Sequence, residues 1–173
     1  MNQSPKSVSA HLMGKVDLIA FDFDGVLTDN RVLVMEYGLE AVLCNRSDGL
    51  AFDMLHAAAV PVVIISTESN GVVSRRAEKL QVPVLQAVIN KQQALQDYCH
   101  SRNFELARVA FVGNDVNDLP AMKIVGFPIA VGDAHPAVKE VARIVLGTRG
   151  GEGVAREIAE QLLGLSYGLA SGR

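Results

Sequence analysis

The sequence has few of the features that mark zinc-binding, nucleic-acid-binding or membrane-spanning proteins. Its two cysteines, Cys44 and Cys99, lie in no CxxC or CxxH motif, which favours reduced structural thiols over a zinc site or a disulfide. No run of Lys and Arg exceeds the Arg75–Arg76 pair and the formal net charge is -3, so nucleic acid is not expected as a partner. Apolar stretches such as residues 60–65 are far shorter than the roughly twenty residues of a membrane span.

The two ends of the chain also lack the patterns of packed or targeting segments. Residues 1–15 are mostly polar and contain no apolar core of a secretion signal, which predicts a flexible tail on a cytoplasmic protein. Residues 164–173 are rich in Gly and Ser and are predicted to form a second flexible tail.

The remainder of the chain predicts a single α/β domain. The whole chain has 173 residues, 49% of them hydrophobic, which is enough for one continuous core. Short β-rich runs alternate with amphipathic stretches, a pattern typical of a Rossmann-like parallel sheet sandwiched by helices. Strands are predicted at residues 16–23, 62–66, 84–86, 108–112 and 128–131, with a further short strand at 143–146. Helices are predicted at residues 48–59, 70–80, 91–102, 117–125 and 153–163.

One segment, residues 31–45, interrupts this alternation. Two β-type runs, VLVM and AVLCN, flank the polar turn YGLE, which predicts a β-hairpin. The hairpin is the only insertion that we expect, so the domain should have no large cap.

Two carboxylates mark the end of the first predicted strand. In the segment IAFDFDGVLTD, Asp22 and Asp24 are two residues apart, and side chains at this spacing project from the same face of a strand. Gly25 allows a sharp turn directly after them. Ligands of open α/β sheets bind at the carboxyl ends of the strands, and paired carboxylates there suit Mg²⁺. A solvated acidic loop is the alternative interpretation.

Other predicted strand ends and helix starts supply further polar groups suited to phosphoryl transfer. Ser66 follows VVII and offers a hydroxyl, Lys91 begins a predicted helix and offers a compact positive charge, and Asp115 and Asp118 in GNDVND offer carboxylates. Each has an ordinary alternative role, as a helix cap for Ser66 and Asp118 or as a surface charge for Lys91. Their order along the chain favours a shared site.

These motifs resemble those of the haloacid dehalogenase superfamily. IAFDFDGVLTD, VVIIS, the region of Lys91 and VGNDVND match its four motifs in order, over about residues 16–163. The small hairpin in place of a cap, followed by NRSDG, AEKL and RGGEGVARE, is similar to the capless subgroup of 3-deoxy-D-manno-octulosonate 8-phosphate phosphatases and to the phosphatase domain of acylneuraminate cytidylyltransferases. The resemblance implies a Mg²⁺-dependent phosphomonoesterase acting on a phosphorylated 2-keto-3-deoxy sugar acid.

The same resemblance implies a role for each candidate residue. Asp22 would be the nucleophile that forms an aspartyl-phosphate, and Asp24 the general acid and base. Asp22, the backbone carbonyl of Asp24 and Asp115 would hold Mg²⁺, with Asp118 in support. Lys91 and Ser66 would neutralise the other oxygens of the transferring group.

Substrate contacts and assembly are also implied by the resemblance. The stretch after the hairpin would line the substrate pocket, together with Glu68. Its residues are Asn45, Arg46, Ser47, Asp48 and Gly49. Arg76 would pair with a substrate carboxylate, or it is a surface arginine beside Arg75. Members of the subgroup form homotetramers, and an exposed VLVM hairpin would need such a partner. The glycines of RGGEG would let the C-terminal tail bend toward a site, or they form a plain turn.

Two positions depart from the pattern of the octulosonate phosphatases. Ser66-Thr67-Glu68 replaces their usual TGR, which resembles phosphatases of nine-carbon keto acids such as KDN or sialic acid 9-phosphate. Asn114 replaces an aspartate, which removes one charge near the expected metal and should alter metal affinity.

Two other classes of function remain open at this stage. Receiver-type signalling modules also combine a strand-end Asp, Mg²⁺, a hydroxyl and a lysine, but they are phosphorylated on a mid-chain strand. A non-catalytic oligomerisation domain associated with an acylneuraminate cytidylyltransferase would be expected to have lost Asp24 or Lys91, and both are present.

Overall fold

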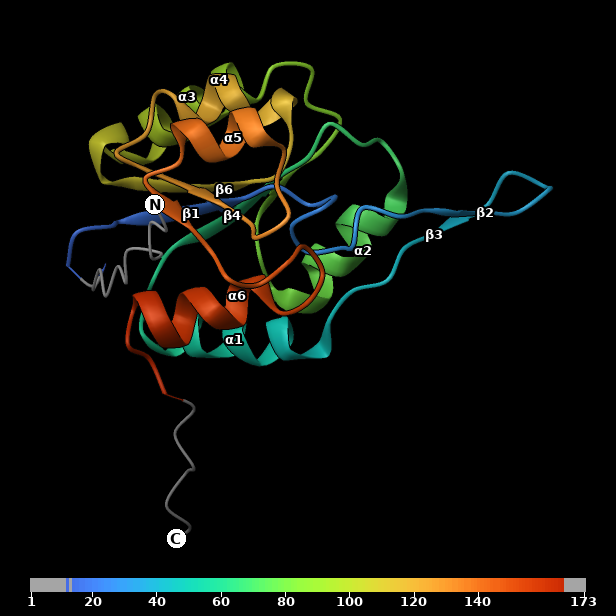
Figure 1. Ribbon diagram of the computed structural model, residues 1–173, viewed down its shortest axis with the longest axis horizontal. Helices are drawn as coiled ribbons and strands as arrows, with labels where there is room; N and C mark the ends of the chain where they lie inside the picture. The colour runs from blue at the N-terminus through green and yellow to red at the C-terminus, as the bar shows by residue number, and fades with distance from the viewer. Residues whose placement is uncertain (1–11, 13, 167–173) are drawn as a thin grey trace, which may run out of the picture.

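The computed structural model describes residues 12 and 14–166, which fold around a six-stranded parallel sheet (Figure 1). The strand order is β5-β4-β1-β6-β7-β8, so the first strand of the chain lies inside the sheet. The strands are β1 (Leu18–Phe21), β4 (Val62–Ile65), β5 (Val84–Leu85), β6 (Val109–Gly113), β7 (Phe127–Ala130) and β8 (Ile144–Val145). Because all six are parallel, the residues that follow them gather at one edge.

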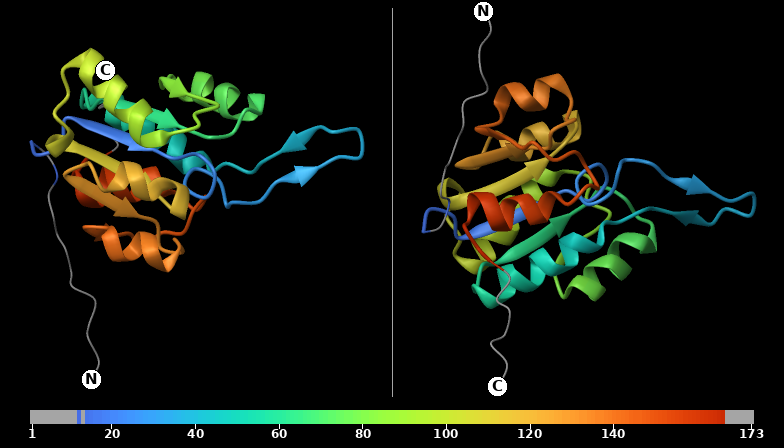
Figure 2. Two further views of the ribbon diagram at one scale, coloured as in Figure 1. Left: turned by 90° about the horizontal axis from the view of Figure 1, so that it is seen from above. Right: turned by 60° about the horizontal axis from the view of Figure 1, so that its bottom comes forward.

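Helices cover both faces of the sheet (Figures 1 and 2). One layer contains α3 (Lys91–Arg102), α4 (Leu119–Met122) and α5 (Pro136–Val141), and the other contains α1 (Arg46–Ala57), α2 (Gly71–Leu80) and α6 (Val154–Glu157). Short 3-10 turns at Leu106–Arg108 and Val116–Asp118 precede β6 and α4, and a π-helical turn, Ile158–Leu162, continues α6. Among the residues described, no helix combines the length and hydrophobicity needed to span a membrane.

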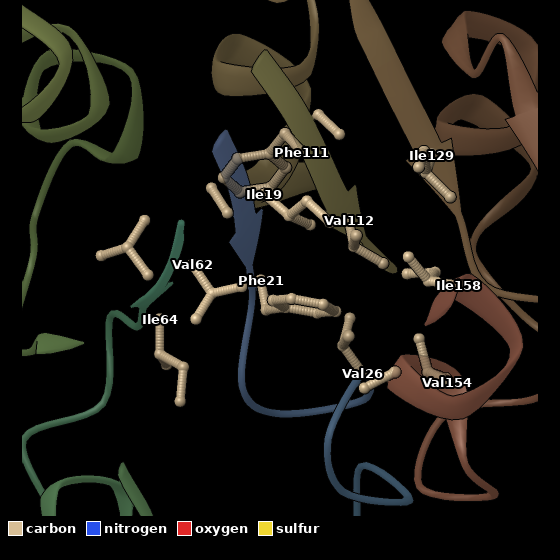
Figure 3. Packing of buried hydrophobic residues seen from close by; sticks show 14 of the residues in the cluster. Ile19, Phe21, Val26, Val62, Ile64, Phe111, Val112, Ile129, Val154 and Ile158 are labelled. Carbon is tan, nitrogen blue, oxygen red and sulfur yellow. The ribbon is translucent and has the colours of Figure 1, made fainter. Parts of the chain in front are cut away.

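The core lies on both sides of the sheet (Figure 3). Along β1 the side chains alternate between the two helical layers, and Phe21 meets Phe52 of α1 edge to face with ring centroids 5.4 Å apart. Val26, just after β1, packs near Val154 and Ile158 of the C-terminal segment. The loop that follows β1 is therefore held by residues more than a hundred positions later in the chain.

The hairpin extends from the body of the molecule (Figures 1 and 2). Its strands β2 (Leu33–Val34) and β3 (Glu40–Ala41) pair antiparallel. Several large apolar side chains along it are exposed: Val32 53%, Leu33 62%, Val34 60%, Tyr37 67%, Leu39 64% and Leu43 76%. A bridge between Thr28 and Cys44 closes its base. The hairpin contributes almost no side chain to the core of this chain.

The structure confirms the predicted α/β class, the parallel sheet and the hairpin, although the bounds of most elements differ by one or two residues. Three differences have a local explanation. Helix α1 begins at Arg46, two residues early, because the side chain of Asn45 accepts the backbone N–H of Ser47 and caps it. The predicted helix at 117–125 is a 3-10 turn followed by the single-turn α4. Helix α5 was missed, although Pro136 at its first position is a known helix start.

The predicted tails fall mostly outside the described residues. Residues 1–11, 13 and 167–173 are not described. Leu12, inside the predicted N-terminal tail, is 1% exposed and its N–H bonds the carbonyl of Leu162, so this part is packed against the C-terminal segment. Leu165 is likewise partly buried against the core. The packed part of the chain therefore extends further into both predicted tails than we expected.

Candidate active site

Asp22 and Asn114 follow the adjacent strands β1 and β6, so the sheet brings them to the same edge. The register pairs Phe21 with Val112, and the N–H of Asp22 donates to the carbonyl of Val112 at 2.9 Å. Gly25 turns the chain directly after Asp24 with a φ of 79°. A Cβ at Gly25 would lie 2.0 Å from Nδ2 of Asn114, so only glycine allows the two segments to approach this closely.

Three buried charged groups form the centre of the site. The Nζ of Lys91 lies 2.6 Å from Oδ1 of Asp22 and 2.7 Å from Oδ1 of Asp118. All three residues are at most 4% exposed. Asp118 is fixed further because its Oδ2 accepts the N–H of Asn114 at 2.9 Å. The structure therefore joins Asp22, Lys91 and Asp118, which the sequence analysis placed in one site.

Two carboxylates share this single ammonium group, and the pKa values of Asp22 and Lys91 are both raised. Burial and the charge of Asp118 raise the pKa of Asp22 to about 7 against the opposing effect of Lys91. Burial alone would lower the pKa of Lys91, but the carboxylates of Asp22 and Asp118 outweigh burial and raise it. Both carboxylates thus favour the charged form of Lys91, and the cluster holds two carboxyl groups against one ammonium group.

Asp24 and Ser66 follow the adjacent strands β1 and β4 at the same edge of the sheet. Burial and, after it, the charge of Glu68 raise the pKa of Asp24. The Oγ of Ser66 is buried and accepts the N–H of Glu68 at 3.1 Å, as a cap does, but this bond leaves the hydroxyl proton free to donate. Both interpretations of Ser66, helix-start cap and donor to a ligand, are therefore compatible with its position.

The oxygens around Asp22 suit a divalent cation, although the donor set differs from the one expected. Within residues 12 and 14–166, no group of three or more His, Cys, Asp or Glu side chains is arranged to hold a metal ion. However, Oδ1 of Asn114 is buried without a hydrogen-bond partner. Oδ1 of Asp115 instead accepts the N–H of Val116 at 2.7 Å. The unpartnered oxygen thus belongs to Asn114, whose N–H contacts Asp118 of the cluster, and this mixed set of oxygens fits a hard cation.

A pocket of about 300 Å³ opens beside Asp24, at the root of the hairpin. It is lined by Asp24, Asn30, Arg31, Val32, Glu40, Val42, Thr67, Glu68, Asn70 and Val72. Glu68 is where the sequence analysis placed it. The hairpin-root residues of this pocket were missed, and the only signal that could have found them is that a hairpin inserted after a strand-end motif must overhang that motif.

The predicted substrate-binding stretch lies elsewhere. Asn45 and Ser47 form the N-terminal cap of α1, and Asp48 is 1% exposed with its Oδ1 accepting the N–H of Ala155 at 3.0 Å. Arg46 and Gly49 line a second pocket of about 320 Å³ between α1 and α2, together with Arg76. Asn45, Ser47 and Asp48 are thus engaged in hydrogen bonds within this chain, and their contact with substrate stays a prediction.

The RGGEG segment packs directly on the loop after β1. The N–H of Gly151 donates to the carbonyl of Val26 at 3.0 Å, and a Cβ at Gly150 would lie 2.1 Å from the carbonyl oxygen of Gly25. Asn45 secures the segment from the other side through its Nδ2, which donates to the carbonyl of Gly151 at 3.3 Å. These glycines therefore form a close contact with the site of their own chain, and are more than a plain turn.

Comparison with known proteins identifies relatives over most of the chain. A family model described as haloacid dehalogenase-like hydrolase matches residues 64–158. The 3-deoxy-D-manno-octulosonate 8-phosphate phosphatase KdsC of Salmonella typhi is 34% identical over 160 residues, covering 90% of this chain and 85% of that protein.

Solved structures of similar proteins belong to the same family. A Streptomyces avermitilis protein assigned to the HAD family of hydrolases is 45% identical, with a TM-score of 0.84, covering 87% of this chain and 92% of that one. The 3-deoxy-D-manno-octulosonate 8-phosphate phosphatase of Moraxella catarrhalis, solved with magnesium ion, phosphate ion and a KDO molecule, is 29% identical with a TM-score of 0.84, covering 88% of each chain.

Proposed function

The chain belongs to the haloacid dehalogenase-like hydrolase family as one of its phosphatases, and we propose that it removes phosphate from a 2-keto-3-deoxy sugar acid phosphate through an aspartyl-phosphate on Asp22. The observation that carries this proposal is the buried contact of Lys91 with both Asp22 and Asp118, beside a pocket lined by Asp24. This contact would supply the proposed reaction with a carboxylate nucleophile and a cation, and Asp24 would supply the acid.

The chemistry has two steps that these residues divide between them. A carboxylate oxygen of Asp22 attacks phosphorus, the bond from phosphorus to the sugar oxygen breaks, and protonated Asp24 gives its proton to that oxygen. Asp24, now a carboxylate, takes a proton from water as the water oxygen attacks phosphorus. The bond to Asp22 then breaks, which releases phosphate. Lys91 and the hydroxyl of Ser66 hold the remaining phosphoryl oxygens.

A divalent cation fits beside this cluster, and Mg²⁺ is the ion that we propose. When bound, it supplies charge neutralisation for the transferring phosphoryl group. Asp22, the backbone carbonyl of Asp24 and Oδ1 of Asn114 would hold it. This set replaces Asp115, whose carboxylate caps the turn at Val116, with Asn114, whose buried oxygen has no partner.

The substrate proposal rests on the relatives and on one local difference. KdsC of Salmonella typhi is named for 3-deoxy-D-manno-octulosonate 8-phosphate, which makes this eight-carbon acid the first substrate to test. Glu68 lines the pocket beside Asp24, so an anion stands where the resemblance to octulosonate phosphatases leads us to expect an arginine. A nine-carbon acid such as KDN or sialic acid 9-phosphate is therefore the second candidate.

The test is phosphate release with and without Mg²⁺ from eight- and nine-carbon keto-acid phosphates, hexose phosphates and an aryl phosphate. We expect preferred turnover of one keto-acid phosphate and none in Asp22→Asn, which keeps the size of the side chain but is not a nucleophile. Release that persists in Asp22→Asn would refute the aspartyl-phosphate. No release from any substrate would favour the oligomerisation domain or signalling module.

We also propose a homotetramer, because the hairpin of each chain exposes an apolar surface that a second copy would cover. Sedimentation velocity of the wild type and of Leu33→Ser/Leu39→Ser, both on exposed positions of the hairpin, tests this proposal. We expect the double variant to dissociate. A monomeric wild type at micromolar concentration would contradict the proposal.

A further inference from the structure

The pocket beside Asp24 contains one basic side chain. Arg31, at the root of the hairpin, is the only Lys or Arg among its lining residues, whereas Asp24, Glu40 and Glu68 are all acidic. An anionic substrate entering this pocket is repelled by the carboxylates of Glu40 and Glu68. The position of its own carboxylate is therefore decided by the single cation.

The acidic side chains are already engaged, but the guanidinium of Arg31 is not. Oε1 of Glu68 accepts the N–H groups of Ser69 and Asn70 at 2.7 and 3.0 Å. Oε2 of Glu40 accepts Nδ2 of Asn70 at 2.8 Å. Among the described residues, Arg31 makes no side-chain hydrogen bond or ion pair, while its backbone N–H is held by Oδ1 of Asp29 at 3.2 Å. Its backbone is thus anchored and its side chain is available.

The other candidate for a carboxylate partner, Arg76, is committed elsewhere. Its Nη2 donates to the backbone carbonyl of Asn45 at 2.8 Å, at the start of α1. It lines the second pocket with Arg46 and Lys79, and that pocket does not include Asp24. Arg76 therefore stabilises the junction of α1 and α2 in this chain.

From these contacts we propose that Arg31 binds the carboxylate of the substrate and selects for acid sugars. The inference rests on the proposed function. In an 8- or 9-phosphorylated 2-keto acid the carboxylate and the phosphate are at opposite ends of the carbon chain. With the phosphate at Asp22 and Lys91, the carboxylate would extend away from that pair, and Arg31 is the basic side chain that lines the pocket beside Asp24. A guanidinium can bind it with two parallel hydrogen bonds.

The test compares Arg31→Gln with Arg75→Gln, a matched control on the exposed face of α2, where Arg75 pairs with Glu78. Steady-state kinetics are measured with 3-deoxy-D-manno-octulosonate 8-phosphate, sialic acid 9-phosphate, glucose 6-phosphate and p-nitrophenyl phosphate. For the preferred acid, Arg31→Gln should raise KM about 10- to 100-fold with little change in kcat, as expected for the loss of charge-assisted hydrogen bonds. The two esters without a carboxylate should change less than about twofold in both variants.

Three outcomes would overturn the assignment. Equal losses of kcat/KM for esters with and without a carboxylate would show that Arg31 supports the pocket without binding the carboxylate. No loss of kcat/KM in Arg31→Gln would show that Arg31 does not contact the substrate. A selective loss in Arg76→Gln with none in Arg31→Gln would move the carboxylate to the second pocket. The wild type separates these outcomes from failure of the proposed function: if it hydrolyses neither keto-acid phosphate, the substrate class is wrong and the inference fails with it.

Discussion

Replacing Asp48 by Asn should stabilise the protein at neutral pH. Asp48 is 1% exposed, its Oδ1 accepts the N–H of Ala155 at 3.0 Å, and its Oδ2 is buried without a partner. Burial raises the pKa of this carboxyl group to about 6 despite the hydrogen bonds from the α6 backbone. An amide can accept the same bond from Ala155 and never carries the charge that burial disfavours.

The size of the effect follows from the pKa of Asp48. One pKa unit corresponds to about 1.4 kcal/mol, so a rise from 3.8 to about 6 costs the folded state about 3 kcal/mol when the carboxyl is ionised. The folded pKa is higher than the unfolded one, so protonation favours the folded state. The penalty is absent below about pH 4, grows as the pH rises to about 6, and is constant above that.

The assay is urea unfolding of wild type and Asp48→Asn from pH 4 to pH 8. We expect the variant to be more stable by up to about 3 kcal/mol at pH 7.5 and nearly equal to wild type at pH 4. Asp53→Asn, an exposed position on the same helix, is the control and should show no pH-dependent difference. A variant less stable than wild type at pH 7.5 would refute the argument, because it would mean that the ionised carboxylate is favourable where it lies.

Three further predictions concern the site itself. Lys91→Met leaves Asp22 and Asp118 buried without their shared cation, so phosphate release should be lost. The free energy of unfolding, measured in urea without Mg²⁺, should fall by roughly 3–5 kcal/mol. An unchanged free energy of unfolding would contradict the geometry. Asn114→Asp adds a charge beside Asp22 and should tighten Mg²⁺ binding about tenfold in calorimetric titration, whereas unchanged affinity would return the ligand role to Asp115. Gly150→Ala brings a methyl within 2.1 Å of the Gly25 carbonyl and should cost about 1–3 kcal/mol in urea, while Gly49→Ala, which meets no atom within 4 Å, should not.

The strands and the charged cluster could be predicted from sequence because each depends on local pattern or on the order of parallel strands. The run VVII predicts a buried strand wherever it occurs, and parallel pairing then brings the residues after β1 and β6 to one edge. The predicted bounds of helix α3, residues 91–102, match the structure. In the structure Asn90 caps the start of this helix and Asn103 its end.

The residues that line each pocket could not be predicted in the same way. Asp48 follows the hairpin in sequence, which suggested a substrate contact, but capping by Asn45 turns its side chain toward Ala155, a partner 107 residues away. Arg31 lies in a segment whose direction is set by the Thr28–Cys44 bridge. The residues next to Asp48 and Arg31 in the sequence give no indication of either long-range contact. We propose Asn114 in place of Asp115 as a metal ligand because the carboxylate of Asp115 accepts a hydrogen bond from the N–H of Val116, which the sequence does not reveal.

The contact between the RGGEG segment and the loop after Asp22 has a consequence for synthesis of the protein. The loop that carries Asp22 and Asp24 leaves the ribosome early, but Gly150 and Gly151 must dock on Gly25 and Val26 before that loop is held in place. A contact spanning so much of the chain forms late, after the sheet between them has been made. A chain that ends before Gly150 therefore contains Asp22, Lys91 and Asp118 but lacks the segment that contacts the loop after β1. We expect phosphatase activity to depend on synthesis of that C-terminal segment.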